Sequence, residues 1–338
     1  MTNISRMSKL AFKICVVVNF LVIYKVSSVS NETSELWDVQ ESPKSSTVYS
    51  QLKHNALVRA IFVQRQERLL VECSKIVDNG SCDTSIKPEM LHHILVDEKH
   101  KLLYCFVPKV ACTNWKRVLM VAREKTTQKD PLLIPANLVH SSNMFRSLNT
   151  YALADIKQML STYNKLIVAR HPLERLLSAY RNKFEVKNKQ SSNYFQIHIG
   201  KRIIKKYRRQ ATKESLSTGN DVTFQEFVQF VTDTAENSTL NEHWKPISEL
   251  CHPCAIKYNF ISKYETLADD ALEILERMGT DWITFPPRPR NSEPTSKKLC
   301  AYYPKLKYEQ LRKLSDIYKL DLRLFDYSLE DIFGFSLA

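Results

Sequence analysis

Two segments of the chain share one order of residue types, and this order limits the possible fold more than any other feature. An apolar run, Leu102 to Val107, leads into the loop Pro108 to Asn114 and then into a segment of helical pattern. A second apolar run, Leu166 to Ala169, leads through Arg170 to a helix that starts at Pro172. Proline suits the first position of a helix because its missing N–H is not needed there. Strand–loop–helix units in alternation predict parallel crossovers and an α/β sheet.

Other elements follow from the periodicity of apolar residues. Ile94 to Val96 forms a short strand that a charged turn joins to the run at Leu102. A helix is also expected from residue 51, with Leu57, Ile61, Leu69 and Leu70 on one apolar face. Further helices are predicted over residues 113–125, 151–164, 172–186, 224–235, 265–279 and 307–325.

The loops after the two strands are candidate anion sites. A loop before a helix offers free backbone N–H groups and the positive end of the helix dipole. Lys109 adds a full charge to the first loop, and Thr113 and Asn114 add short donors. In the second, Arg170 can fork onto a phosphate, and Ser178 lies two turns further along the helix.

Other interpretations of these loops stay open. The first loop has no glycine and no Gly-Lys-Ser/Thr, so a magnesium-dependent nucleoside triphosphatase fits poorly. A purely structural strand–loop–helix corner is the alternative to an anion site. Arg175 and Arg181 are expected to pair with acids or solvent.

The formal net charge of +13 favours an anionic partner, which could be nucleic acid, anionic lipid or a polyanionic sugar. Simple solubility is the alternative.

Basic residues precede an apolar stretch of roughly 15 residues, Leu10 to Tyr24, which is shorter than the ~20 of a spanning helix. It is either a signal anchor or a signal peptide cut near Ser27 and Ser28. Both translocate the chain, which makes cytosolic nucleic acid a poor partner.

Eight cysteines fit an oxidising compartment. Outside the apolar stretch there are seven, an odd number, so at least one is free or pairs between chains. The segment Cys251-His-Pro-Cys254 could be half of a zinc site, but disulfides suit the compartment better. Cys105 and Cys112 could be buried free thiols, and the pairing is left open. Glycosylation sequons begin at Asn31, Asn79 and Asn237.

The two loop motifs carry a resemblance to a known family. "VPKVACTNWKR" and "RHPLERLLSAYRNKF" resemble the donor-binding loops of the Golgi carbohydrate sulfotransferases. The resemblance extends to "NEHWKPISELCHPCAIKYNFISKYETLADDA" and covers roughly residues 90–330. Within the family the sequence looks most like the chondroitin 4-O-sulfotransferases, and the dermatan and N-acetylgalactosamine 4-O-sulfotransferases are near relatives. It implies an α/β, P-loop-like sulfotransferase fold with a central parallel sheet flanked by helices.

The resemblance also implies a donor and its ligands. The donor is 3′-phosphoadenylyl sulfate (PAPS), and no metal is required. The first loop would cradle the 5′-phosphosulfate, with Lys109 stabilising the leaving phosphate; its residues are Pro108, Lys109, Val110, Ala111, Cys112, Thr113 and Asn114. The second segment would hold the 3′-phosphate; its residues are Arg170, His171, Pro172, Leu173, Glu174, Arg175, Leu176, Leu177 and Ser178. The family usually has an acidic residue where this chain has His171.

A general base must accept the proton of the sugar hydroxyl, and histidine suits that role. His140 is the preferred candidate, because relatives also carry histidine at this position, and His243, beside Glu242, is the second. A basic run is a candidate track for an anionic acceptor, although a solvated helix face is the usual explanation. Its members are Lys201, Arg202, Lys205, Lys206, Arg208 and Arg209.

The resulting hypothesis is a single-pass type II Golgi membrane protein. It consists of a cytosolic tail (1–9), a signal anchor (10–25), a lumenal stem (26–55) and a lumenal sulfotransferase domain (56–338). It would sulfate the 4-hydroxyl of N-acetylgalactosamine in chondroitin. Dermatan or the terminal N-acetylgalactosamine of glycoproteins are alternative acceptors, and an inactive glycosaminoglycan-binding protein is the alternative from another class. A nucleotide kinase is disfavoured because the chain offers neither a Walker lysine nor a magnesium-binding acid.

Overall fold

A computed structural model of the chain describes most of the residues that carry these predictions. The described ranges are 43–78, 85–141, 143–186, 190–237, 240–287 and 294–334. The predicted tail, anchor and most of the stem lie outside them, as do Asn31 and Asn79. No helix within these ranges is both long enough and apolar enough to cross a bilayer.

The chain divides into two compact units. One consists of residues 55–327 and contains all the strands and both loop motifs. The other consists of residues 1–54 and 328–338, where the structure describes the first part of helix α2 and the short helix α16 (Glu330–Phe333). Ser328 and Asp331 exchange hydrogen bonds at the start of α16.

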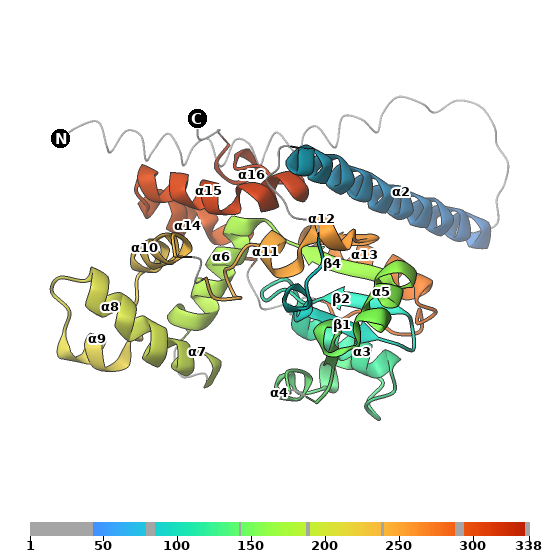
Figure 1. Cartoon of the computed structure of the whole chain (residues 1–338), viewed down its shortest axis with the longest axis horizontal. Coiled ribbons are helices and arrows are strands. Elements are labelled where there is room, and N and C mark those ends of the chain that lie inside the picture. Colours follow the sequence, from blue (N-terminus) through green and yellow to red (C-terminus); the bar gives the residue numbers. More distant parts are fainter. Residues whose placement is uncertain are drawn as a thin grey trace. The chain divides into compact units, whose positions relative to one another are not determined.

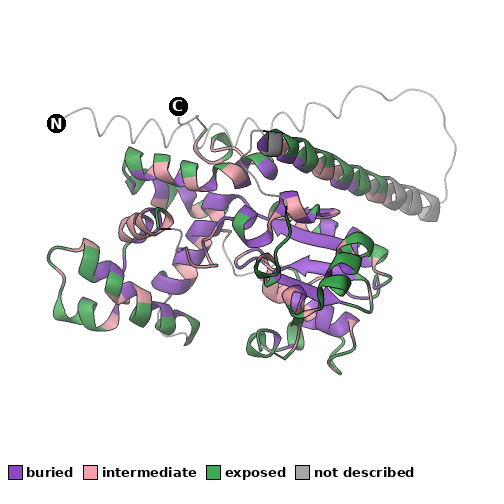
Figure 2. Ribbon diagram, viewed as in Figure 1, coloured by how far each residue is buried: buried purple, intermediate pink, exposed green. Residues whose placement is uncertain are grey.

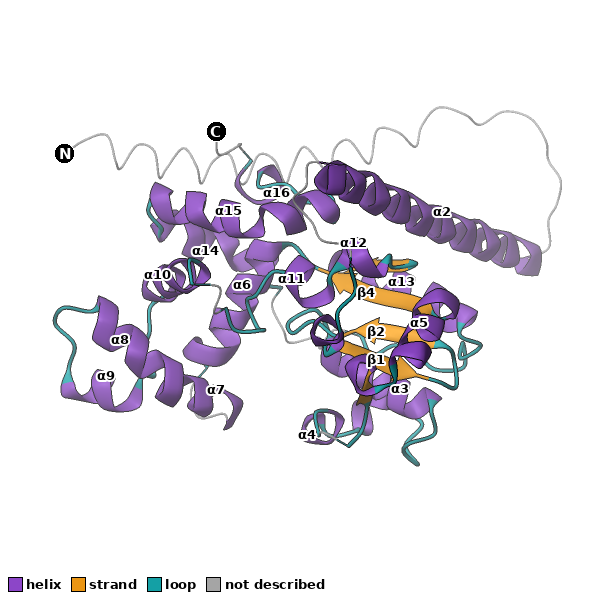
Figure 3. Cartoon of the chain, viewed as in Figure 1, coloured by secondary structure: helices purple, strands orange, loops and turns teal. Residues whose placement is uncertain are grey.

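The unit 55–327 is built around a five-stranded sheet in the order β3-β1-β2-β4-β5. Its strands are β1 (Ile94–Asp97), β2 (Leu102–Cys105), β3 (Arg146–Ser147), β4 (Asn164–Ala169) and β5 (Phe260–Lys263). Strands β2, β4 and β5 are parallel, with Leu166 opposite both Tyr104 and Phe260. Figure 3 shows the strands grouped together, with helices around them.

The prediction of a central parallel sheet is therefore confirmed only in part, because the sheet is mixed. Strand β1 is antiparallel to both β2 and β3. The physical reason is the short turn between Asp97 and Leu102, since only antiparallel neighbours can be joined by so few residues. The three parallel strands are the ones that are separated by helical crossovers, as the alternation of elements predicted.

Helices fill both crossovers between the parallel strands (Figure 1). Between β2 and β4 lie α3 (Cys112–Ala122), α4 (Ala136–Val139) and α5 (Leu153–Thr162). Between β4 and β5 lie α6 (Pro172–Tyr180), α7 (Gln190–Phe195), α8 (Lys201–Tyr207), α9 (Lys213–Thr218), α10 (Phe224–Ala235), α11 (Ile247–Cys251) and α12 (Pro253–Ile256). Helices α13 (Leu267–Arg277), α14 (Leu299–Tyr302) and α15 (Tyr308–Leu324) follow β5. The helix predicted over 224–235 coincides with α10, which begins with a capping box between Thr223 and Glu226.

The core lies on both faces of the sheet. All four residues of β2 are buried, and so are the last five of β4 (Figure 2). Strands buried on both faces are expected where helices cover a parallel sheet.

Helix α2 (Pro43–Asp78) was predicted from residue 51, but its predicted apolar face is wrong in part, because Leu69 is buried and Ile61 is half-buried while the other two leucines are not. Leu57 and Leu70 are exposed, at 59% and 45%. The buried residues are Val58, Phe62, Leu69, Cys73 and Ile76. Phe62 packs edge-on against Phe260 of β5, with ring centroids 5.6 Å apart.

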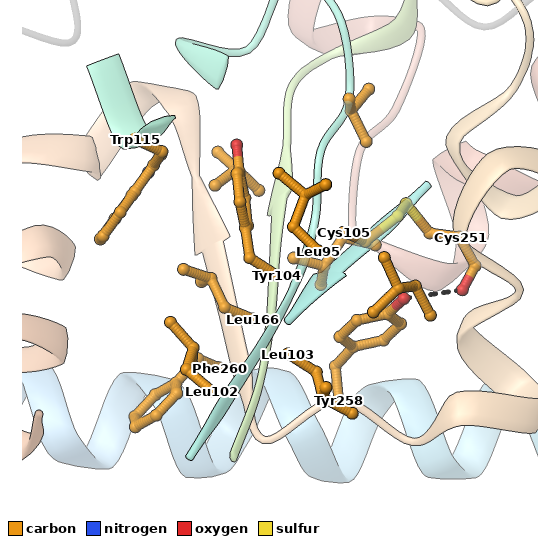
Figure 4. Close-up of a cluster of buried hydrophobic side chains, with 14 of the residues drawn as sticks. Leu95, Leu102, Leu103, Tyr104, Cys105, Trp115, Leu166, Cys251, Tyr258 and Phe260 are labelled. Carbon is orange, nitrogen blue, oxygen red and sulfur yellow. Dashed lines mark hydrogen bonds between the residues drawn. A yellow bond between two sulfur atoms is a disulfide. The ribbon is translucent and has the colours of Figure 1, made fainter. Parts of the chain in front are cut away.

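Two disulfides connect the segment Cys251–Cys254 to different parts of the fold. Cys254 pairs with Cys73 of α2, and Cys251 pairs with Cys105 at the end of β2. Figure 4 shows the second bridge, beside a hydrogen bond of 2.8 Å from the Tyr258 hydroxyl to the Cys251 carbonyl. The disulfide interpretation of the two cysteines is thus confirmed in preference to a zinc site.

Candidate active site

The two predicted anion loops meet at one edge of the sheet. Strands β2 and β4 are parallel neighbours, so the loops that follow their carboxyl ends lie side by side. Arg170 Nη1 donates a 3.0 Å hydrogen bond to the carbonyl of Lys109, which joins one loop to the other. The guanidinium also lies 4.1 Å from the ring centroid of Tyr264, which follows the third parallel strand.

The first loop takes an unusual backbone path. Lys109 and Ala111 have positive φ angles of 75° and 65°, a region that residues with a side chain rarely adopt. Ala111 is the N-cap of α3, and its carbonyl accepts from Asn114 and Trp115 N–H groups. The N–H groups of Cys112 and Thr113 precede these bonds and belong to the orphan donors of the helix start. Left-handed residues in such a loop form a concave anion-binding backbone.

Arg175 of α6 supports the first loop through hydrogen bonds to backbone carbonyls. Its fully buried guanidinium donates to the carbonyls of Pro108 (2.9 Å), Glu242 (2.8 Å) and Lys245 (2.5 Å). The expectation that Arg175 pairs with an acid or with solvent is wrong, because its partners are backbone carbonyls. The expectation for Arg181 is confirmed, since it pairs with Glu185 at 3.0 Å.

The second loop holds its own helix in place. His171 is the N-cap of α6, and its Nδ1 accepts from the Leu173 N–H at 3.2 Å. A capping acid would accept the same bond, so the imidazole replaces it without loss of the cap. Arg170 is buried and pairs with Glu174, one turn along α6, at 3.2 Å. Of the other predicted ligands, Ser178 and Thr113 are half-buried, whereas Val110, Leu173, Leu176 and Leu177 are buried in the interior.

Three lysines near the loops carry charges without a carboxylate partner among the described residues. They are Lys109, Lys116 of α3 and Lys183, which follows α6. The ammonium groups of Lys116 and Lys183 lie against aromatic rings, at 4.2 Å from Phe106 and 4.3 Å from Phe195. Burial lowers the pKa of all three ammonium groups. The pKa of Lys109 falls to about 7, mainly through burial and then through the positive charge of Lys183.

Sequence reasoning missed two of these lysines. Lys116 lies three residues after Thr113, a spacing that places both on one side of a helix and could have revealed it. Lys183 lies in the π-helical turn Arg181–Glu185, where a regular helical wheel gives the wrong direction.

Both candidate bases lie close to this group of charges. His140 is exposed, and its Nε2 is 3.0 Å from the Thr113 hydroxyl. His243 is half-buried, and its Nδ1 is 2.9 Å from the Asn241 side-chain oxygen. Partial desolvation of the imidazole, which occurs even at the exposed His140, and then nearby lysine charges lower the pKa of His140 to about 4 and of His243 to about 3. Both imidazoles are therefore neutral at pH 7 and able to accept a proton.

The predicted basic run is only partly available to a ligand. Lys206 pairs with Asp233 at 3.1 Å, and Arg208 pairs with Asp221 at 2.6 Å and with Glu226 at 2.7 Å. Arg202, Lys205 and Arg209 are exposed. Asn237, the sequon residue within the described ranges, is exposed just after α10.

Within the described ranges, the histidines, cysteines and carboxylates form no group of three or more that could hold a metal ion. Cys112 has no disulfide partner, and burial raises the pKa of its thiol. It is therefore a protonated thiol at neutral pH.

Comparisons with known proteins show the family to which this chain belongs. Residues 92–328 match the model of the Sulfotransferase family. The chain is 41% identical over 247 residues to carbohydrate sulfotransferase 11 of Mus musculus, covering 72% of this chain and 69% of the relative. It is 36% identical to carbohydrate sulfotransferase 8 of Mus musculus, covering 78% and 63%, and 41% identical to carbohydrate sulfotransferase 14 of Danio rerio, covering 71% and 63%. No solved structure matches the chain. Because the family match includes both loops and the strands that position them, this chain belongs to the Sulfotransferase family and is a carbohydrate sulfotransferase.

Proposed function

We propose that this enzyme transfers the sulfuryl group of PAPS to the 4-hydroxyl of N-acetylgalactosamine in chondroitin, in the Golgi lumen and from a membrane anchor in residues 10–25. The family supplies the reaction class and its donor, PAPS. The resemblance of the loop motifs to the chondroitin 4-O-sulfotransferases supports the acceptor and the compartment. A 41% identical relative named carbohydrate sulfotransferase 11 is consistent with this choice.

The observation that carries the proposal is the convergence of unpaired positive charge on the edge where β2 and β4 end. Lys109, Lys116 and Lys183 have no carboxylate within salt-bridge distance among the described residues, and the start of α3 adds free N–H donors. Burying unpaired cations is costly, so the arrangement favours a strongly anionic ligand that restores the balance. A donor with a phosphosulfate and a 3′-phosphate is such a ligand.

In the reaction, the acceptor hydroxyl oxygen forms a bond to sulfur while the bond between sulfur and the bridging phosphate oxygen breaks. The electron pair of the broken bond stays on the phosphate, and the hydroxyl proton goes to a base. The role of Lys109 is to hold its positive charge beside that phosphate, where negative charge increases in the transition state. Arg170 and Arg175 position Lys109 by fixing the carbonyls of Lys109 and Pro108.

The hydrogen bonds favour His243 over His140 as the base. Asn241 Oδ1 accepts from Nδ1 of His243, which leaves the Nε2 lone pair to take a proton. Nε2 of His140 is already engaged with Thr113. His243→Ala should lower kcat by about 10²-fold or more while donor affinity is unchanged, and His140→Ala should have the smaller effect. The reverse order would return the role to His140.

The central test uses the purified full-length chain and labelled PAPS. Desulfated chondroitin, desulfated dermatan and a terminal N-acetylgalactosamine glycan are offered in parallel, and the sulfate position is mapped after digestion. Label on the 4-hydroxyl of chondroitin is the expected result, and Lys109→Ala should lower the rate by about 10²- to 10³-fold. Label on another acceptor would replace the substrate but keep the reaction. Absence of both label and PAPS binding would contradict the proposal.

A further inference from the structure

Lys183 is a buried cation of the site that neither the donor phosphate nor the proton transfer requires. Lys183 lies in the turn Arg181–Glu185, where α6 continues as π-helix. Single π-turns inside helices are rare and are often found at functional sites, because the extra residue turns a side chain in a direction that a regular helix does not allow. Lys183 is the middle residue of this turn.

The environment of Lys183 does not neutralise it. The side chain is buried, with a relative exposure of 7%, and its ammonium group forms no hydrogen bond or ion pair with any described residue. Its direct contact is the face of Phe195, with Nζ 4.3 Å from the ring centroid. A cation–π contact offsets only part of the cost of burying an ammonium group.

The position of Lys183 relative to the site follows from shared contacts. The Phe195 ring also packs edge-on against His243, with centroids 5.1 Å apart, so Lys183 and His243 lie on the same aromatic ring. Arg175 bonds to the carbonyls of both Glu242 and Pro108, which places the segment around His243 next to the donor loop. Lys183 is therefore near both a candidate base and Lys109.

The nearby acid does not explain Lys183. The Glu242 carboxylate lies 3.7 Å from His93 Nε2 and 3.8 Å from His243 Nδ1, and it makes no ion pair with Lys183. Its side chain is 44% exposed, so water already solvates it. Lys183 thus lies within electrostatic range of Glu242 but has no ion-pair partner among the described residues.

We propose that Lys183 is a second cationic ligand of the sulfuryl group during transfer, contacting its non-bridging oxygens while Lys109 acts on the phosphate. The inference rests on the proposed function. As the acceptor oxygen bonds to sulfur and the bond to the bridging phosphate oxygen breaks, the sulfuryl oxygens carry negative charge between the two partners. Lys183 stabilises that charge without gaining or losing a proton, and the hydroxyl proton still goes to the histidine.

The test distinguishes contacts to the sulfuryl group from contacts to the rest of the donor. Lys183→Met removes the charge and keeps much of the side-chain length. It should lower kcat by about 10²- to 10³-fold, whereas affinity for adenosine 3′,5′-bisphosphate, which lacks the sulfuryl group, should change less than about threefold. Lys183→Arg keeps the charge and should retain more activity than Lys183→Met. Calorimetry gives the affinity, and steady-state kinetics give kcat and KM for both substrates.

Lys165→Met is the matched control. Lys165 is equally buried, at 8%, but its ammonium donates to the carbonyls of Leu160 and Tyr163 at the other end of β4. It should lower the melting temperature without changing kcat. If Lys183→Met does not fold, Lys183→Gln takes its place, because it also removes the charge and keeps part of the side-chain length. A loss of kcat in a folded Lys183→Gln that is smaller in Lys183→Arg supports the inference, and an unchanged kcat in Lys183→Gln contradicts it.

Three results would overturn the inference. The first is an unchanged kcat in Lys183→Met, and the second is an equal loss of bisphosphate affinity, which would assign Lys183 to a phosphate. The third is a defect that disappears with carboxyl-reduced chondroitin, which would assign it to the uronate of the acceptor. If the wild-type chain fails to bind the bisphosphate, the proposed function itself fails, and this result is separate from all three.

Discussion

Two residues of the first loop, Pro108 to Asn114, adopt backbone angles that are usually found at glycine. Lys109 and Ala111 have φ angles of 75° and 65°, although the loop contains no glycine. A left-handed conformation costs a residue with a Cβ about 1–2 kcal/mol. Hydrogen bonds from Arg170 to the Lys109 carbonyl and from Arg175 to the Pro108 carbonyl hold the strained backbone in place. Position 109 can therefore carry a charged side chain, which glycine would not supply.

Ala111→Gly should therefore stabilise the protein. Glycine adopts this conformation freely, and the relief of strain exceeds the added entropy of the unfolded chain. We expect the free energy of unfolding to rise by up to about 1 kcal/mol. Ala179→Gly in α6 is the control, because its regular helical position should make it destabilising by about 1 kcal/mol. Equal losses in both variants, measured by denaturant titration, would show that position 111 is not strained.

The charge of Lys109 should make donor binding depend on pH. Burial and the charge of Lys183 lower the pKa of Lys109 to about 7, so above that pH the free enzyme has a neutral Lys109. An anionic ligand favours the protonated form, so binding takes up a proton and affinity falls as pH rises. Phosphate groups are fully ionised above about pH 7 and do not add to this change.

We expect affinity for adenosine 3′,5′-bisphosphate to fall between pH 7 and 9, by up to about tenfold per pH unit. Lys109→Arg should reduce the slope, because arginine stays protonated over this range. Lys116 has a lowered pKa too and should leave a residual slope. Calorimetry in two buffers of different ionisation enthalpy measures the proton uptake directly. The same slope in wild type and Lys109→Arg would exclude Lys109 as the titrating group.

At the residue level, charge and position in a motif could be predicted, but partners could not. The sequence placed Lys109 in the loop after one strand and Arg170 directly after another, where the structure has them. It could not show that Arg175 bonds to three carbonyls, because those carbonyls come from segments 67 and 70 residues away. It also could not show Lys183, whose direction depends on one π-turn.

At the level of elements, alternation of apolar and helical segments was enough to find strands β1, β2 and β4 and the described helices of nine residues or more, whereas β3, β5 and the shorter helices were not predicted. The boundaries of α10 follow from a capping box and a clear apolar stripe. Helix α2 was harder, because its sequence has exposed leucines beside buried ones, and the face that packs is decided by Phe260, Cys254 and the α13 acids. The antiparallel pairing of β1 follows from its short turn and was available to sequence reasoning.

The two disulfides make a matched pair for testing how the donor loop is supported. Cys105 ends β2, four residues before Lys109, and its partner Cys251 ends α11. Cys73 and Cys254 connect α2 to α12 instead. Loss of either bridge should destabilise the protein by about 2–5 kcal/mol, because both close loops of more than a hundred residues.

Only the loss of the Cys105–Cys251 disulfide should affect donor binding. Cys105→Ala with Cys251→Ala should weaken bisphosphate binding in the fraction that remains folded, whereas Cys73→Ala with Cys254→Ala should leave it unchanged. Differential scanning calorimetry measures the first effect and titration calorimetry at low temperature the second. If both double variants lost affinity equally, the Cys105–Cys251 bridge would have no specific role in positioning the loop.

For the whole molecule, the net charge of +13 acts at two ranges. In the proposed function, the buried lysines should act on the donor at contact distance, where salt has little effect. Exposed cations such as Arg202, Lys205 and Arg209 act across water and are screened over about 8 Å at physiological ionic strength. Donor binding and polymer binding should therefore respond differently to salt.

Replacing Arg202, Lys205 and Arg209 by glutamine should weaken chondroitin binding about tenfold at low salt, at roughly 0.5 kcal/mol per exposed charge. It should also flatten the dependence of log Kd on log salt concentration, while bisphosphate affinity stays constant. Arg208 is left intact because its pairs with Asp221 and Glu226 hold α8 to α10. The control replaces Lys125, Lys129 and Lys157, which are exposed and lie beyond the end of α3 or on α5, and removes the same total charge. Equal effects from the two triple variants would mean that chondroitin responds to net charge alone; a larger effect from the first assigns the polymer track to α8.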